Sequence, residues 1–110
     1  MITVAETALF MKKAAKLMSK TERIELINFI AQNPEAVDLI TGTGGVRKVR
    51  FAKEGKGKSG SFRVVYYFYN TDNPLLLFTV FDKGEKVNIS DQEKNDLRKV
   101  VTLIKKEMKL

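Results

Sequence analysis

The sequence predicts an α+β fold in which helices pack on one face of a small, mostly antiparallel sheet. Two stretches near the N-terminus and one at the C-terminus carry apolar residues at three- and four-residue steps, which is the spacing of a helix with one buried side. Between them lie runs rich in β-branched and aromatic residues, separated by turn-forming segments. We expect a single domain over residues 1–110, with two N-terminal helices, one C-terminal helix and the order β-α-α-β-β-β-α.

The N-terminal third predicts a short edge strand followed by two helices. Residues 2–5 form the apolar strand, and residues 7–18 form the first helix. Ser19-Lys20-Thr21-Glu22 has the spacing of a capping box, so a second helix begins there and ends near Pro34. Pro34 can instead open a short third helix through Ile40. The residues expected on the buried sides are Leu9, Phe10, Ala14, Leu17 and Met18 in the first helix and Ile24, Ile27, Phe29 and Ile30 in the second.

The remaining residues predict three antiparallel strands and a final helix. Residues 41–45 contain three glycines and break the chain before the strand 46–51. The strands 61–69 and 75–81 follow, joined by a strong turn. Ser90-Asp91-Gln92-Glu93 fits a second capping box, which begins the C-terminal helix. The buried side of that helix is expected to carry Leu97, Val100, Val101, Ile104 and Met108.

The composition excludes several kinds of chemistry. The chain has no cysteine and no histidine, so disulfides, thiol nucleophiles and histidine acid–base chemistry are excluded. No pair of carboxylates is spaced for a two-metal site, and we expect neither a metal nor a cofactor. No apolar stretch approaches the ~18 residues of a membrane span, so we expect a cytoplasmic protein with no membrane partner.

Positive charge is concentrated in one segment of the chain. Residues 44–69 hold seven of the twenty Lys and Arg residues and a single acid, Glu54, in a chain of net charge +7. These cations lie on two predicted strands and the glycine-rich loop between them, and such a surface indicates a polyanion, most commonly RNA or DNA. Gly57-Lys58-Ser59 in the loop does not complete a P-loop, because Ala52 stands where that motif needs glycine and a strand follows instead of a helix.

Three cations, Lys48, Arg50 and Arg63, form the sharpest candidate site. If the strands that carry them pair across the loop, all three lie on one face, close enough to bind consecutive phosphates. The plainer alternative is the solvated outer face of a half-buried hairpin. Tyr66 and Tyr67 also leave two options, because aromatic residues on a strand mostly pack in the core, but a ring directed into a basic groove can stack on an unpaired base.

Residues 42–50, 55–60 and 63–68 together resemble the central block of HigB-type toxins in the RelE/ParE superfamily. They read Gly-Thr-Gly-Gly-Val-Arg-Lys-Val-Arg, Gly-Lys-Gly-Lys-Ser-Gly and Arg-Val-Val-Tyr-Tyr-Phe. The resemblance implies a fold like that of microbial ribonucleases and an endonuclease that cuts mRNA in the A site of the ribosome. It also implies a cognate antitoxin as partner, which we expect to be a small helix-turn-helix protein.

The resemblance also implies that Lys48, Arg50 and Arg63 are catalytic. In this scheme the ribose 2′-hydroxyl attacks the adjacent phosphate, and Lys48 acts as general base because the cations around it favour its neutral amine. The two arginines stay protonated and clamp the phosphate. RelE-like enzymes often carry an arginine and then a tyrosine after the last strand, and the comparable residues 81–89 of this chain contain neither, so we expect Lys83 or Lys86 to protonate the leaving oxygen. The residues expected to bind RNA or the ribosome are Arg47, Lys53, Lys56, Lys58, Tyr66 and Tyr67.

A second interpretation keeps the basic surface without catalysis. The ParE branch of the superfamily shares the fold and poisons DNA gyrase, so the fold alone does not decide the activity. The alternatives to an mRNA endonuclease are therefore a gyrase-directed toxin or a simple RNA-binding module.

Overall fold

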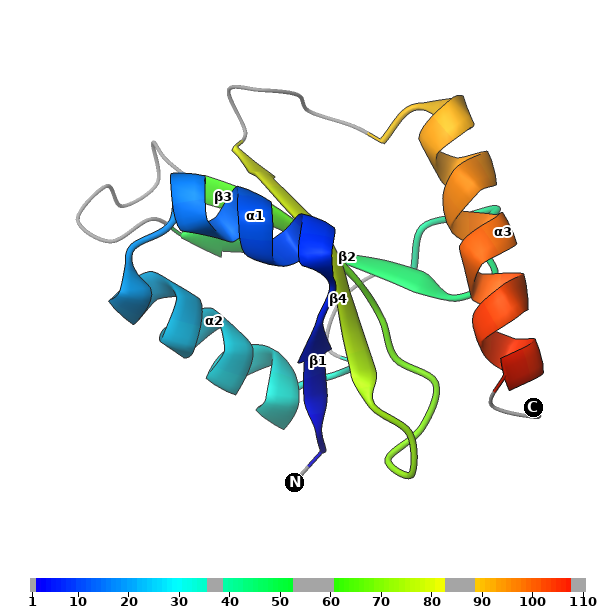
Figure 1. The fold of residues 1–110 in the computed structure, drawn as a ribbon, viewed down its shortest axis with the longest axis horizontal. Coiled ribbons are helices and arrows are strands. Elements are labelled where there is room, and N and C mark those ends of the chain that lie inside the picture. Colours follow the sequence, from blue (N-terminus) through cyan, green and yellow to red (C-terminus); the bar gives the residue numbers. More distant parts are fainter. Residues whose placement is uncertain (1, 36–38, 53–60, 83–88, 108–110) are drawn as a thin grey trace.

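The computed structural model describes residues 2–35, 39–52, 61–82 and 89–107 and shows the predicted α+β architecture (Figure 1). The element order is the predicted β-α-α-β-β-β-α. The elements are β1 (Val4–Glu6), α1 (Ala8–Leu17), α2 (Lys20–Gln32), β2 (Val46–Ala52), β3 (Ser61–Tyr67), β4 (Leu75–Asp82) and α3 (Asp91–Glu107).

The four strands lie in the order β1-β4-β3-β2. β2, β3 and β4 pair antiparallel, as predicted. β1 pairs with β4 in parallel, so the sheet is mixed. Thr7 fixes this junction, because its hydroxyl lies 2.9 Å from the carbonyl oxygens of Leu77 and Phe78 and accepts a hydrogen bond from the amide of Phe10. One side chain thereby joins the first strand to the central sheet and caps α1.

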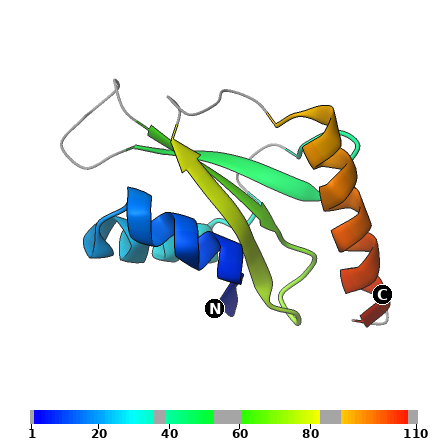
Figure 2. The same ribbon diagram turned by 45° about the horizontal axis from the view of Figure 1, so that its top comes forward.

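The helices cover both faces of the sheet, which corrects the expectation that they share one face. α1 and α2 lie together on one side, and α3 crosses one end of the other side (Figures 1 and 2). Val64 and Val65 are neighbours on β3, yet they belong to two separate core clusters. Successive side chains of a strand point to opposite faces, and every residue of β3 is buried. Helices on one face alone would therefore leave half of this strand in water.

Both predicted capping boxes are present. The Ser19 hydroxyl accepts from the amide of Glu22 at 3.0 Å, and the Glu22 carboxylate accepts from the amide of Ser19 at 2.8 Å. Ser90 and Glu93 form the same reciprocal pair at the start of α3, at 3.1 and 3.0 Å. These bonds satisfy amides that a helix leaves without internal partners, so the sequence fixes both starting points locally.

The buried sides of the helices differ in part from the prediction. In α2, Leu26 and Ile30 are fully buried, whereas Ile24 and Phe29 are 50% and 39% exposed. Leu26 and Ile30 lie one turn apart, so the side of α2 that meets the sheet is narrower than its apolar residues suggested. In α1, Leu9 is 54% exposed. In α3, Val101 is buried and Leu97 and Ile104 pack against the same cluster, whereas Val100 is 41% exposed; the predicted Met108 lies outside the described residues.

The connection between α2 and β2 contains no helix within its described residues. Pro34 and Glu35 form a turn, and Leu39 makes an isolated bridge with Arg47. The alternative short helix falls partly on residues 36–38, which lie outside the described residues. The chain then turns into β2 through Gly42, Gly44 and Gly45, whose φ angles of 85°, 81° and 127° favour glycine.

Candidate functional site

The strand register brings Lys48, Arg50 and Arg63 to one face of the sheet. Arg50 and Arg63 are direct partners across β2 and β3, and Lys48 lies opposite Val65. Alternate residues of a strand share a face, roughly 6–7 Å apart along the chain. β2 begins beside α3 and runs away from it (Figures 1 and 2). The three cations therefore lie on the face that α3 covers at one end, with Arg50 and Arg63 toward the opposite end.

Arg63 is held more tightly than a surface arginine. Only 8% of the residue is exposed, and one guanidinium nitrogen, Nη1, donates to the Ser61 hydroxyl at 2.8 Å. Burial, together with the charge of Arg50, lowers the pKa of Arg63 below its usual value. Both effects disfavour the protonated guanidinium, which an anion bound between the two arginines would stabilise. The plainer alternative, a solvated outer face of the hairpin, therefore does not describe Arg63.

The three cations have no acidic partner in the part of the chain that the structure describes. An ion pair between Arg23 and Glu6, at 2.7 Å, lies elsewhere, at the start of the chain. Like charges directly opposite each other destabilise a sheet, and buried charges are normally paired. A pair of facing arginines without a carboxylate is therefore an arrangement suited to an anion of the size and charge of a phosphate.

Three of the residues predicted to bind RNA make contacts within the fold. Arg47 points to the opposite face from Lys48, and its guanidinium donates to the Glu35 carbonyl at 3.4 Å. Tyr66 is 1% exposed and donates its hydroxyl to the Pro34 carbonyl at 2.9 Å. Tyr67 is 2% exposed and packs in the cluster under α3. A base cannot stack on either ring in this arrangement, because both rings already fill the core.

The other predicted site residues fall outside the described residues. Lys53, Lys56 and Lys58 lie between β2 and β3 in the sequence, and Lys83 and Lys86 follow β4. Their expected roles remain predictions.

Ser61 is the site residue that the sequence reasoning missed. It is 6% exposed, lies on the same face as Arg63, and accepts the hydrogen bond that orients the guanidinium. Residues two apart on a strand lie on the same face, so the spacing of Ser61 and Arg63 in the sequence indicates that the two side chains are neighbours.

The geometry defines a small α+β protein whose sheet carries three cations, Lys48, Arg50 and Arg63, on one face. Residues 2–109 match the family described as the RelE toxin of the RelE/RelB toxin–antitoxin system, and the chain belongs to this family. It is thus a toxin of a toxin–antitoxin pair, and its partner is a cognate antitoxin. None of the helices in the described ranges is long and apolar enough to cross a membrane.

Proposed function

We propose that this toxin is a ribosome-dependent mRNA endonuclease of the HigB type. The observation that carries the proposal is the buried Arg63, directly opposite Arg50 on the face that also holds Lys48 and without an acidic partner among the described residues. Such an arrangement stabilises additional negative charge on a phosphate, which is what the transition state of phosphodiester cleavage develops. Membership of the RelE toxin family supports the same activity.

The proposed reaction uses the 2′-hydroxyl of the substrate as nucleophile. Lys48 takes the hydroxyl proton as general base, the 2′-oxygen bonds to the adjacent phosphorus, and the bond to the 5′-oxygen breaks. Arg50 and Arg63 bind the phosphate oxygens while the phosphorus is five-coordinate. A lysine after β4, Lys83 or Lys86, gives its proton to the departing 5′-oxygen. The products are a 2′,3′-cyclic phosphate and a free 5′-hydroxyl.

We include the ribosome because the described part of the site has cations to bind phosphate but no exposed aromatic ring on which a base could stack. Tyr66 and Tyr67 are buried, and the exposed aromatic residue nearest in sequence, Tyr69, lies beyond the end of β3. Catalysis by positioned charges depends on a substrate held in register. We infer that the A site supplies this positioning and that the toxin supplies the cations. The resemblance of residues 42–68 to HigB-type toxins also supports a reaction in which the ribosome positions the mRNA and the toxin supplies the cations.

Translation of a defined mRNA in vitro, with mapping of its 5′ ends, tests the proposal. We expect cuts phased to codons, ending in a 5′-hydroxyl, that are absent when ribosomes are omitted. Lys48→Arg should keep ribosome binding but lose cutting, because it retains the charge and cannot accept a proton at accessible pH. Lys99→Ala, which removes an exposed lysine of α3, is the matched control and should cut normally.

Three outcomes would contradict the proposal. Intact mRNA with firm ribosome binding would make the protein a simple RNA-binding module. Linearised DNA in a parallel gyrase reaction would make it a gyrase-directed toxin. Full cutting by both Lys48→Arg and Lys48→Ala would remove Lys48 from the role of general base.

A further inference from the structure

Two hollows adjoin on the surface between α1, β4 and α3, and Leu9 lines both. The first, of about 320 Å³, is formed along α1 by Leu9, Leu17 and three lysines. The second, of about 160 Å³, lies between the start of α1, β4 and the start of α3. A shared lining residue makes the two hollows one continuous surface. Neither hollow is lined by Lys48, Arg50 or Arg63.

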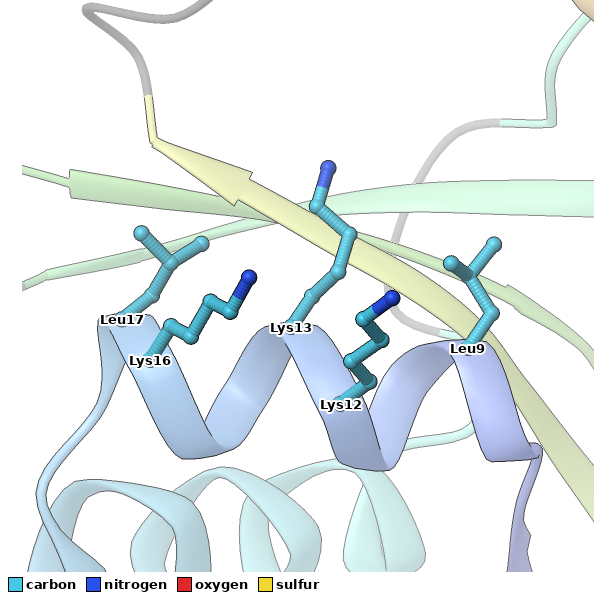
Figure 3. A pocket seen from close by; sticks show the side chains of 5 residues that line it. All are labelled: Leu9, Lys12, Lys13, Lys16 and Leu17. Atoms are coloured by element: carbon cyan, nitrogen blue, oxygen red, sulfur yellow. The ribbon is translucent and has the colours of Figure 1, made fainter.

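The first hollow is positively charged over an apolar base. Lys12, Lys13 and Lys16 project from one side of α1 between Leu9 and Leu17 (Figure 3). Their three- and four-residue spacing places all five residues on the same side of the helix. Lysine stems are themselves apolar, so the hollow combines hydrophobic walls with ammonium groups at its opening. Leu9, at one end, is 54% exposed and so offers apolar surface beside the lysines.

The second hollow carries the opposite charge. Phe78 and Ile89, both more than nine-tenths buried, give it an apolar floor. Glu93 and Asp96, from the first two turns of α3, supply carboxylates at its edge. The surface thus runs from positive, through the exposed Leu9, to negative.

The positive and negative ends of this surface determine which kind of molecule can bind along it. A nucleic acid presents phosphates along its whole length, so the carboxylates of the second hollow would repel it. A polypeptide segment can match both ends and place an apolar side chain between them. The family to which the chain belongs supplies such a polypeptide, because its toxins are paired with an antitoxin.

We propose that the two hollows form one docking groove for an amphipathic segment of the cognate antitoxin. Acidic side chains of that segment lie against Lys12 and Lys16, an apolar side chain packs beside Leu9, and a basic side chain meets Asp96. The opposite charges at the two ends fix the direction in which the segment lies and select against partners with the reverse charge order. The proposal rests on the toxin–antitoxin pairing and is independent of RNA cleavage.

Charge-reversal variants of the full-length toxin test the groove. The probe is the antitoxin encoded beside the toxin, titrated as a purified protein by calorimetry. Lys12→Glu with Lys16→Glu should weaken its binding by about tenfold or more, and Asp96→Lys by roughly threefold to tenfold, which are ordinary effects for charged contacts at an interface. Lys20→Glu and Lys99→Glu change exposed lysines that line neither hollow and should bind within about twofold of the unmodified toxin.

Two further measurements keep the test decisive. Each altered position lies on an exposed part of a helix, and an unchanged circular dichroism spectrum and melting temperature establish that the variant folds. A reverse substitution in the antitoxin, acid to lysine, should restore binding to the doubly substituted toxin. Such recovery reports direct contact between the two charges and is not expected from a structural effect.

Other results would overturn the proposal. Antitoxin affinity within about twofold of the unmodified toxin in both groove variants would show that the segment binds elsewhere. Loss of ribosome binding with unchanged antitoxin affinity would assign the lysines to ribosomal RNA. Concentration-dependent self-association that disappears in the groove variants, with the antitoxin still bound normally, would assign the groove to a second copy of the chain.

Discussion

The two faces of β3 are built from alternating residues and differ in chemistry: one is wholly apolar in the core, and the other also carries a charged residue. Phe62, Val64 and Tyr66 lie in the apolar cluster under α1 and α2. On the opposite face, Val65 and Tyr67 belong to the apolar cluster against which α3 packs. Arg63 lies on the same face, two residues before Val65. Burial alone therefore does not identify the apolar core of this sheet, because Phe62 at 1% exposure and Arg63 at 8% differ in charge but little in exposure.

Substitution of Phe62 gives the largest expected effect on the apolar face. Phe62→Ala leaves a cavity under α1 and α2, and such substitutions cost about 3–5 kcal/mol in free energy of unfolding. Chemical denaturation measures the loss. A cost below about 1 kcal/mol would show that the helices close over the gap, and that this face is less rigid than its burial indicates.

Arg63→Ala tests the other face at the adjacent position. Cleavage of translated mRNA should fall by about 10²–10³, the usual cost of removing a donor that stabilises a transition-state charge. The free energy of unfolding should change by less than about 1 kcal/mol, because the substitution also removes a buried cation that faces Arg50. Cutting at the normal rate would move the proposed catalytic role to the lysines after β4.

Tyr66→Phe tests the apolar face at alkaline pH. The lost hydrogen bond to Pro34 should cost about 1 kcal/mol at neutral pH. Burial raises the pKa of Tyr66 to about 12, so the folded state favours the neutral hydroxyl. Its contribution to stability is complete below pH 10, the ordinary tyrosine value, and is lost as the pH rises through about 12.

The phenylalanine variant should therefore lose stability less steeply than the unmodified protein over that range. The pKa of Tyr67 is also raised by burial, but Tyr67 is present in both proteins and does not affect the difference. Denaturant midpoints measured at several pH values give the two slopes. Parallel slopes would mean that the hydroxyl of Tyr66 reaches water in the folded state.

Ser61→Ala, on the face that carries Arg63, should give the smallest effect. The variant leaves Arg63 in place but removes the acceptor 2.8 Å from its Nη1, so we expect cleavage about threefold to tenfold slower. Ser61→Thr retains the hydroxyl and should restore most of the rate. A structural role alone would lower the melting temperature without this recovery of activity by threonine.

Most of the local structure could be predicted from the sequence. The capping boxes at Ser19 and Ser90 depend on residues three apart, and the antiparallel pairing of β2 with β3 joins two strand-like runs on either side of one loop. The same alternation placed Lys48, Arg50 and Arg63 on one face. These features need no information beyond neighbouring residues.

The remaining features depend on contacts between distant segments. The side of the sheet on which α3 packs is decided by which surface the rest of the chain leaves uncovered. The burial of Tyr66 depends on a carbonyl thirty-two residues away, at Pro34. The exposure of Leu9 depends on α3 and β4, which form the adjoining hollow. Helical periodicity identifies an apolar side but not what lies against it.

The parallel pairing of β1 with β4 has a consequence for the order of events during synthesis. Thr7 is joined to residues seventy and seventy-one positions later, and β4 occupies an inner position in the sheet. The N-terminal strand and α1 therefore have no stable place to pack until almost three-quarters of the chain has been made. A nascent toxin thus already carries Lys48, Arg50 and Arg63 before it has the complete sheet that aligns them. The time needed to finish the chain delays the activity, so an antitoxin already present can meet the toxin as it folds.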